Sequence, residues 1–178
     1  LEGEEVTHRG RVTVVQAKLY SRPQTPVPLF GAAMTEATAR FVGSWADGLL
    51  TAGGEPEQVG RIIEAFRSNG GEGKPVHIQH ALSWAPTEDE AIAEALHQWS
   101  PAVIGGDAAW DLRLPRDFDN AARLVGAGDI GDAVAVSADL GRHKAWIEGL
   151  ASLLPTAIHL LCVGRNQANF IEAFGRQV

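Results

Sequence analysis

The feature of this chain that most constrains its fold is a regular alternation of apolar segments with helical patterns from Val27 onward. Runs typical of buried strands lie at 27–33, 47–53, 75–85 and 156–164. The helical patterns that follow them lie at 36–45, 55–71, 87–99 and 166–178. Strands that alternate with helices form a parallel sheet, whose crossover connections are right-handed in nearly all proteins. The sequence therefore predicts an α/β fold with four β-α units.

Four such units fit either a small open sheet or half of a (β/α)8 barrel. A complete barrel takes about 250 residues, whereas this chain has 178. Its length therefore fits only half a barrel. We expect a hairpin and connector at 1–26, followed by the four units at 27–178. The hairpin itself is expected at 5–20, where β-branched and polar residues alternate around an Arg-Gly turn.

The segment between the third and fourth strands is less regular. Its glycine and proline residues predict an irregular stretch at 100–116. Helical spacing of the apolar residues then predicts helices at 117–125 and 140–154. No internal repeat or low-complexity segment interrupts the order of the units.

Composition limits the classes of function. Lys and Arg total 15 against 22 Asp and Glu, for a formal net charge of −7, which argues against binding of nucleic acid or anionic membranes. A small-molecule substrate is the expected partner. The single cysteine, Cys162, excludes an intrachain disulfide and a multi-cysteine metal site, so no metal is predicted and the cytoplasm is the expected compartment. No signal peptide is visible, and no apolar run reaches the roughly 18 residues of a membrane span.

Five stretches of the chain resemble a known family. They read "GEEVTHRGRVTV", "AKLYSRPQTPVPLFGAA", "FVGSWADGLLTAG", "APTEDEA" and "HLLCVGRNQANFIEAF". In this order they resemble the C-terminal half of the luciferase-like flavin and deazaflavin oxidoreductases. The branch they resemble most is that of the coenzyme F420-dependent glucose-6-phosphate dehydrogenases. The resemblance implies that the four strands are the fifth to eighth of a TIM-type (β/α)8 barrel.

The resemblance also implies which parts of the barrel lie elsewhere. In this family the first half carries the residues that face the reactive ring of the cofactor, so the catalytic residues are unknown from this chain. The chain starts with Leu1, and its only methionine is Met34, which agrees with a piece of something longer. Intact barrels of the family commonly form homodimers. The expected protein partners are therefore a second copy or the missing N-terminal half.

The turn "GAAMT" between the first strand and the first helix is the candidate cofactor site. Its small residues allow close approach of the backbone, and free N–H groups at a helix N-terminus bind anions readily. The alternative is that Thr35 only caps the helix and nothing binds. The resemblance implies that this turn contacts the phosphate-bearing tail of the cofactor. The cofactor-binding candidates are Ala33, Met34, Thr35, Ala37 and Thr38.

The turn departs from the dehydrogenase pattern. Dehydrogenase-like members have two glycines where this chain has Met34 and Thr35, with Glu36 next to them. The side chains crowd the turn, and a carboxylate near an anion weakens the binding of that anion. Backbone N–H contacts do not depend on side-chain identity, so cofactor binding is retained as a hypothesis.

Substrate choice departs further from that branch. The resemblance implies that sugar-phosphate dehydrogenases hold the substrate phosphate with a threonine, two lysines and an arginine. Here the positions after the sixth barrel strand are Ala52 and Glu55, and the arginine position falls near Ala133. No lysine lies between Lys74 and Lys144. Because those groups are missing, glucose 6-phosphate is not the expected substrate.

The third strand, "VHIQHALSW", supplies polar candidates for a substrate site. Alternate residues of a strand face opposite sides. The small and polar set, which should face the barrel interior, is His77, Gln79, Ala81 and Ser83. The substrate-binding candidates are Ala52, Gln79 and Ser83, and the alternative for the latter two is a satisfied polar layer inside the barrel. His77 and His80 face opposite ways, so they are not a metal pair.

Three residues near the last strand give weaker signals. His159 and Cys162 are more typical of packing than of chemistry. Arg165 lies beside the N-terminus of the last helix, where it fits either an anionic group or solvent. None of the three is assigned a catalytic role.

The predicted function is an oxidoreductase that moves a hydride between coenzyme F420 and a small organic substrate other than a sugar phosphate. An FMN-dependent luciferase-like monooxygenase or reductase is the alternative within the same family, with the turn at Met34 serving the FMN phosphate. A third hypothesis, from a different class, is a non-catalytic half-barrel module for binding or assembly.

Overall fold

The centre of the fold is a parallel sheet of five strands. These are β3 (Phe30–Ala32), β4 (Gly48–Ala52), β5 (Val76–Ser83), β6 (Ala135–Val136) and β7 (Ala157–Cys162). Their order is β3-β4-β5-β6, with β7 paired to β5. This computed structural model describes residues 3–178, with only the backbone described at 106 and 107, so residues 1 and 2 of the predicted hairpin-and-connector region lie outside it. The predicted α/β fold with parallel pairing is confirmed.

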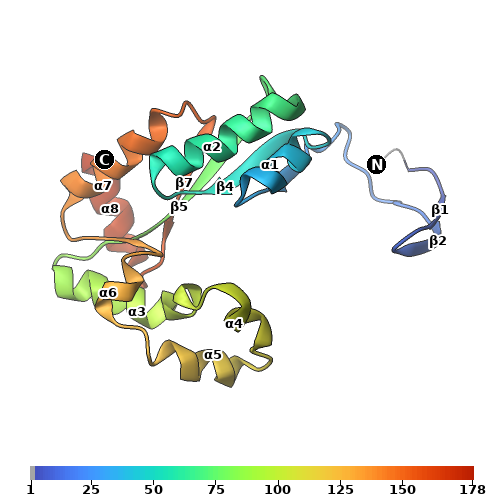
Figure 1. Cartoon of the computed structure of the whole chain (residues 1–178). Helices are drawn as coiled ribbons and strands as arrows, with labels where there is room; N and C mark the ends of the chain where they lie inside the picture. The colour runs from blue at the N-terminus through green and yellow to red at the C-terminus, as the bar shows by residue number, and fades with distance from the viewer. Residues whose placement is uncertain (1–2) are drawn as a thin grey trace.

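Helices connect and cover these strands. They are α1 (Glu36–Gly43), α2 (Pro56–Phe66), the π-helical turn η1 (Arg67–Gly71), α3 (Glu88–Val103), α4 (Gly106–Asp111), α5 (Pro115–Ala122), α6 (Ala127–Ile130), α7 (Leu140–Ala151) and α8 (Gln167–Gln177). None of the helices in the described range combines the length and apolar character needed to cross a bilayer. Figure 1 shows α3 to α6 gathered as one group, apart from α1 and α2.

The predicted hairpin is confirmed. Strands β1 (Val6–Arg9) and β2 (Thr13–Ala17) pair antiparallel. Figure 1 shows them on an extended connector, well away from the parallel sheet. Their side chains are exposed except for half-buried Val14. The hairpin therefore contributes little to the core of this chain.

The first strand of the sheet is shorter than predicted. The sequence predicts a strand at 27–33, but β3 begins only at Phe30. Pro28 has no N–H to give to a ladder, and the backbone N–H of Leu29 donates to the Asp47 carboxylate at 2.8 Å. Leu29 still contacts the residue before β4, because its carbonyl accepts from the Asp47 N–H at 2.8 Å, but residues 27–29 lie outside the strand.

The prediction of an irregular stretch at 100–116 is wrong. Helix α3 continues through Pro101 to Val103, and α4 follows it. Pro101 lies in the last turn of α3, where its missing N–H removes only one helical hydrogen bond. The neighbouring Ser100 hydroxyl donates to the Leu96 carbonyl one turn earlier in the same helix. A single proline near a helix end was therefore insufficient to stop the helix.

Strand β6 was not predicted, so the sheet has one more strand than the four β-α units imply. Leu82 pairs with Ala135 of β6 and with Cys162 of β7. A strand residue has only two sides, so β6 and β7 flank β5 on opposite sides. Pairing with β4 ends at Gln79, which places β6 beyond the end of β4. Two residues are too short to show a strand period in the sequence.

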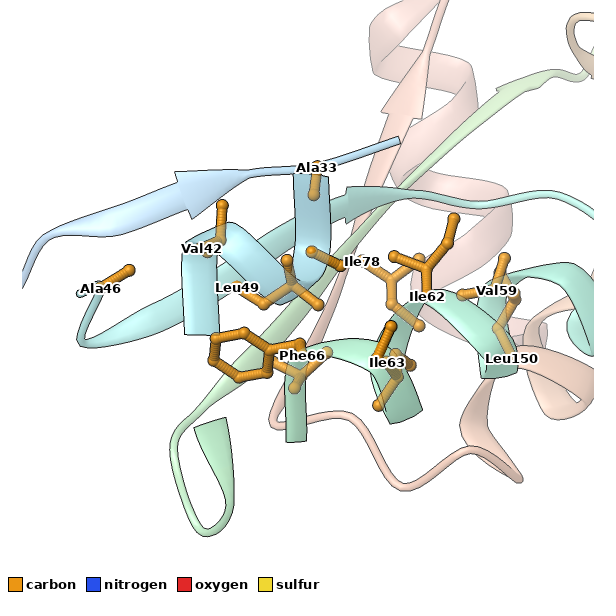
Figure 2. Close-up of a cluster of buried hydrophobic side chains, with 13 residues drawn as sticks. Ala33, Val42, Ala46, Leu49, Val59, Ile62, Ile63, Phe66, Ile78 and Leu150 are labelled. Carbon is orange, nitrogen blue, oxygen red and sulfur yellow. The ribbon is translucent and has the colours of Figure 1, made fainter. Parts of the chain in front are cut away.

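One face of the sheet, here called the outer face, forms the main core with α1, α2 and α7. Figure 2 shows its apolar side chains, among them Leu49, Ile63, Phe66 and Leu150, converging between the strands and the helices. All are buried. This cluster packs α1, α2 and Leu150 of α7 against strands β4 and β5.

The opposite face, here called the inner face, is covered only in part. Near the carboxyl ends of the strands, Ala81 and Leu161 pack against Ala95 of α3 and Ile130 of α6. Toward the amino ends, His77 is half-buried and His159 is exposed. The burial pattern of β5 alternates as the strand parity predicted, with the set that begins at Val76 on the outer face.

Candidate functional site

The turn between β3 and α1 is built on a buried anchor. Ala33 is buried, and its backbone N–H donates to the Leu50 carbonyl at 3.0 Å. Figure 2 shows the Ala33 side chain directed at the core cluster. Met34 then projects outward and is 64% exposed. The chain therefore leaves the sheet at a fixed point and presents the start of α1 to the surface.

Thr35 caps α1. Its extended backbone (φ −135°, ψ 153°) lets its Oγ1 accept a hydrogen bond from the Thr38 N–H at 3.2 Å. The same hydroxyl donates to Thr38 Oγ1 at 3.0 Å. The capping interpretation is thus correct as local structure. The N–H groups of Glu36 and Ala37, the first two helical residues, still have no acceptor within the helix.

A hollow lies beside this turn. It has a volume of about 210 Å³ and is lined by Met34, Thr35 and Glu36 and, from α2, by Gln58, Arg61 and Ile62. Ile62 also belongs to the core cluster, which fixes α2 against the sheet. The lining from α2 was missed by sequence reasoning, because Gln58 and Arg61 lie 22 to 27 residues away along the chain, on the exposed side of an ordinary amphipathic helix.

The carboxylate of Glu36 is neutralised by two arginines. It lies 3.1 Å from Arg40 Nη2 and 3.7 Å from Arg61 Nε. Arg61 also contacts the Glu57 carboxylate at 2.9 Å. These groups are exposed, so the pairs add little stability. They do remove much of the repulsion that an isolated Glu36 would exert on an anion in the hollow.

The structure brings two of the substrate-binding candidates together. Ala52, at the end of β4, pairs with Gln79 of β5. Ala52 is half-buried and Gln79 is exposed, and both lie on the inner face. Beyond them, a side chain added at Gly54 would meet no atom within 4 Å. The loop after β4 is therefore open at Gly54, whereas a side chain added at Gly53 would meet His80 at 2.9 Å.

The third candidate, Ser83, is buried within the protein. Its Oγ donates to the Ala91 carbonyl of α3 at 2.8 Å, and none of its surface is exposed. The hydroxyl joins β5 to α3 instead of facing a surface that a substrate could reach. For Ser83 this geometry favours the alternative of a satisfied polar group.

His77 and His159 meet on the inner face, which sequence reasoning missed. His159 Nε2 and His77 Nδ1 are 3.1 Å apart and share a hydrogen bond. His80 lies on the outer face, as predicted. The available signal was the parity of the last two strands, but it requires knowing that β5 and β7 are neighbours and in which register they pair. No group of three or more His, Cys, Asp or Glu that could hold a metal occurs in the described range.

Polar side chains tie together the loops that follow β5, β6 and β7. The Trp84 indole N–H donates to the Ala138 carbonyl at 3.0 Å, and the Asn166 amide donates to the Trp84 carbonyl at 2.9 Å. The Ala138 N–H donates to the Glu88 carboxylate at 2.7 Å. We call these residues, with Glu94 and Arg165, the polar network.

Arg165 is committed to Glu94 within this network. Its Nη2, Nε and backbone N–H donate to the Glu94 carboxylate at 2.7, 3.1 and 2.9 Å. Hydrogen bonding from Arg165 lowers the pKa of Glu94 to about 2. Of the two interpretations of Arg165, anion binding and free solvation, the structure favours neither, because an internal carboxylate occupies the guanidinium.

Two buried histidines lie on the outer face without full hydrogen bonding. His143 Nε2 contacts the Ser137 carbonyl at 2.9 Å, but its Nδ1 and the Nε2 of His80 have no partner among the described residues. Burial lowers the pKa of both rings. Burial also raises the pKa of the Cys162 thiol, so Cys162 has the packing role that was expected.

The profile of the luciferase-like monooxygenase family matches residues 1–157. The chain belongs to this family. A curated relative, the F420-dependent glucose-6-phosphate dehydrogenase of Microbacterium testaceum (strain StLB037), is 23% identical over 188 residues. That alignment covers 99% of this chain and 55% of the relative. The chain thus spans about half the length of the curated protein that it matches.

Solved structures agree on the fold. An F420-dependent secondary alcohol dehydrogenase in complex with an F420-acetone adduct matches with a TM-score of 0.80 and 22% identity, over 100% of this chain and 56% of that one. The coenzyme F420-dependent tetrahydromethanopterin reductase of Methanopyrus kandleri matches with a TM-score of 0.71 and 20% identity, over 99% and 58%. The family resemblance and the partial TIM-type barrel that the sequence predicted are confirmed.

Proposed function

We propose that this chain is part of an F420-dependent oxidoreductase and that its β3–α1 turn holds the phosphate-bearing end of the cofactor. The observation behind this proposal is the hollow at the turn, which lies beside two helix N–H groups without helical acceptors. When bound, the deazaflavin accepts or donates the hydride. The residues of this chain bind and orient it.

Three features of the turn suit a phosphate. The backbone N–H groups of Glu36 and Ala37 point out of the first turn of α1, where the helix dipole favours an anion. The Thr35 cap fixes the direction of that turn. Arg40 and Arg61 offset the charge of Glu36. Backbone contacts of this kind do not depend on the side chains at Met34 and Thr35.

The proposed substrate is a small organic molecule without a phosphate group. Ala52 and Gln79, the candidates that remain on the open inner face, are uncharged. The guanidinium of Arg165 is occupied by Glu94. Nothing among these side chains supplies the cations that would hold a sugar phosphate. Homodimer formation and a cytoplasmic location stay predictions.

An FMN-dependent monooxygenase or reductase is the second candidate. The family bears the name of a luciferase-like monooxygenase, and a helix N-terminus binds the phosphate of either cofactor. The F420-dependent relatives favour the deazaflavin. A direct comparison of the two cofactors decides between the candidates.

The test is a fluorescence titration of the protein with F420 and, separately, with FMN. Thr35→Pro should distort the turn, because its φ of −135° is far from the value that proline requires. We expect this variant to bind F420 at least about tenfold more weakly while the fold is kept, which corresponds to about 1.4 kcal/mol. Tighter binding of FMN than of F420 would favour the second candidate.

Thr87→Pro is the matched control. Thr87 caps α3 with the same geometry, φ −126° and ψ 154°, and accepts from the Glu90 N–H at 3.3 Å. It does not line the hollow. Equal loss of F420 affinity in both variants, or no binding of either cofactor to the unmodified protein, contradicts the proposed site.

A further inference from the structure

Four charged side chains are linked beside the hollow at the β3–α1 turn. Glu36 and Arg61 line the hollow. Arg40 lies 3.1 Å from Glu36, Arg61 lies 3.7 Å from Glu36, and Glu57 lies 2.9 Å from Arg61. We call these four residues the charge chain. Its two carboxylates and two guanidinium groups join α1 to α2 and add no net charge to the site.

The arginines of the charge chain are already engaged. Arg40 Nη2 donates to the Glu36 carboxylate, and Arg61 Nη1 donates to the Glu57 carboxylate. An anion in the hollow has to compete with these carboxylates for the guanidinium groups. The positive potential that remains for it is that of the α1 N-terminus, which is equivalent to about half an elementary charge. This potential suits an anion with one charge better than an anion with two.

Glu36 both attracts and repels an anion in the hollow. Its backbone N–H is one of the two in the first turn of α1 without a helical acceptor, while its carboxylate lines the same hollow. An anion bound to that N–H therefore lies near the carboxylate. Arg40 and Arg61 offset part of the repulsion. The remainder is about twice as large for a dianion as for a monoanion.

Phosphate groups of cofactors differ in their charge. A phosphomonoester carries a charge of about −1.5 to −2 at neutral pH, because its second pKa is about 6. A phosphodiester has no second ionisable oxygen and carries a single negative charge. FMN ends in a phosphomonoester, whereas the phosphate of F420 is a diester within the chain of the cofactor.

We propose that Glu36 makes the hollow selective for a singly charged phosphodiester over a doubly charged phosphomonoester. This inference rests on the proposed function for the position of the cofactor, and it adds the residue that separates F420 from FMN. Glu36 repels a dianion more strongly than a monoanion. The charge chain keeps Arg40 and Arg61 from balancing the second negative charge.

The test uses dimethyl phosphate and methyl phosphate, a diester and a monoester that need no cofactor ring. Each is titrated into the protein at about pH 7.5, where the monoester is close to doubly charged, while NMR follows the amide resonances of Glu36 and Ala37. We expect the diester to bind at least as tightly as the monoester. In Glu36→Gln the affinity for methyl phosphate should rise about threefold more than the affinity for dimethyl phosphate, because the repulsion is removed and the arginines are released.

Glu57→Gln is the matched control. It removes one carboxylate from the same arginine, Arg61, but Glu57 does not line the hollow and its side chain is 89% exposed. The ratio of the two affinities should therefore change by less than about 1.5-fold. Tighter binding of methyl phosphate to the unmodified protein overturns the proposal. An equal change of the ratio in Glu57→Gln and Glu36→Gln also overturns it.

Titration with the cofactors separates this inference from the proposed function. If F420 does not bind while the small anions show the expected preference, the proposed function is wrong and the selectivity of Glu36 stands. If F420 binds but Glu36→Gln leaves the ratio of the small anions unchanged, the inference is overturned and the proposed function stands. If neither small anion moves the resonances of Glu36 and Ala37, the hollow is not an anion site and both are overturned.

Discussion

The loops at the carboxyl ends of the strands fall into two regions with opposite designs. After β3 and β4 parts of the backbone are open: Met34 projects outward, the hollow lies beside α1, and a side chain added at Gly54 would meet no atom within 4 Å. After β5, β6 and β7 the side-chain donors of the polar network are bonded to protein acceptors, as in the contacts of Trp84 and Arg165. Both regions lie on the same sheet.

The two regions differ in whether their hydrogen-bonding groups are free for a ligand. A ligand needs donors that are not already used, and such groups remain at the start of α1. In the polar network the donors are bonded to protein atoms, although the buried Oδ1 of Asn166 has no partner in the described structure. This region therefore ties α3 to the last two loops. In a barrel fold, where the loops after the strands form the site, the open loops are the ones expected to contact a ligand.

The largest expected effect is on the free energy of unfolding, and it contrasts a substitution beneath the polar network with one at the open turn. Leu82 has no exposed surface and packs with Cys162, Phe170 and Phe174 under the polar network. Leu82→Ala should lower the free energy of unfolding by about 3 kcal/mol, because it leaves a cavity. Met34→Ala, at the open turn, should change it by less than about 0.5 kcal/mol. Urea denaturation of both variants measures the contrast, and equal losses would show that the open turn is also part of the core.

A smaller effect concerns acid and the outer face. Burial lowers the pKa of His80 and His143 from 6.5, so the folded protein binds fewer protons than the unfolded chain below that pH. The stability that depends on their neutral form is complete above pH 6.5 and is lost as the pH falls below it. His80→Leu should flatten this decline, as followed by thermal unfolding across pH.

His97→Leu is the control for the acid effect. His97 is exposed on α3, so its removal should leave the pH dependence of unfolding unchanged. If His80→Leu declines with acid as steeply as the unmodified protein, the buried ring is not the source of the effect. The Nε2 of His80 has no partner in the described structure, so an apolar replacement also removes an unsatisfied group.

The smallest expected effect concerns the Glu94–Arg165 pair. Glu94→Gln removes the charge that Arg165 contacts, and it should lower the free energy of unfolding less than Leu82→Ala does, since the Arg165 side chain is 58% exposed and that of Glu94 20%. Hydrogen exchange should rise in the first half of α3 and at Arg165. Because the pKa of Glu94 is about 2, the difference from the unmodified protein should persist in mild acid and shrink as the pH approaches that value.

Glu90→Gln serves as the matched control on the same helix. Its side chain is exposed and is not bonded to Arg165. If hydrogen exchange rises as much in Glu90→Gln as in Glu94→Gln, the effect comes from the charge of the helix in general and not from the contact with Arg165. It would also weaken the distinction between the polar network and the open loops.

Much of the fold could be predicted from the chain because its signals are local. The alternation of Val76, Ile78 and Leu82 with polar residues gave β5 and its buried face, and these residues are indeed buried. Thr35 and Thr87 marked the starts of two helices that they cap. The errors came where local rules compete: Pro101 does not end α3, and β6 is too short to show a period.

The candidate site was predicted less completely. The turn at Met34 and Thr35 could be located from the strand-to-helix transition, and its cap is as expected. The contribution of Arg61 to the hollow depends on how α2 packs beside α1. The burial of the Ser83 hydroxyl depends on the packing of α3 against β5, which places the Ala91 carbonyl within hydrogen-bond distance of it. Neither contact has a local sequence signal.

The sequence by itself determined the α/β class, the order of the four β-α units, the caps at Thr35 and Thr87 and the faces of the residues of β5, because periodicity and capping act over a few residues. Tertiary structure decided which groups remain available. It brings His77 and His159, which are 82 positions apart in the sequence, into hydrogen-bond contact. It pairs Arg165 with Glu94, 71 positions away, and leaves the first N–H groups of α1 without a helical acceptor. Contacts of that range depend on strand register and helix packing, which the whole chain sets at once.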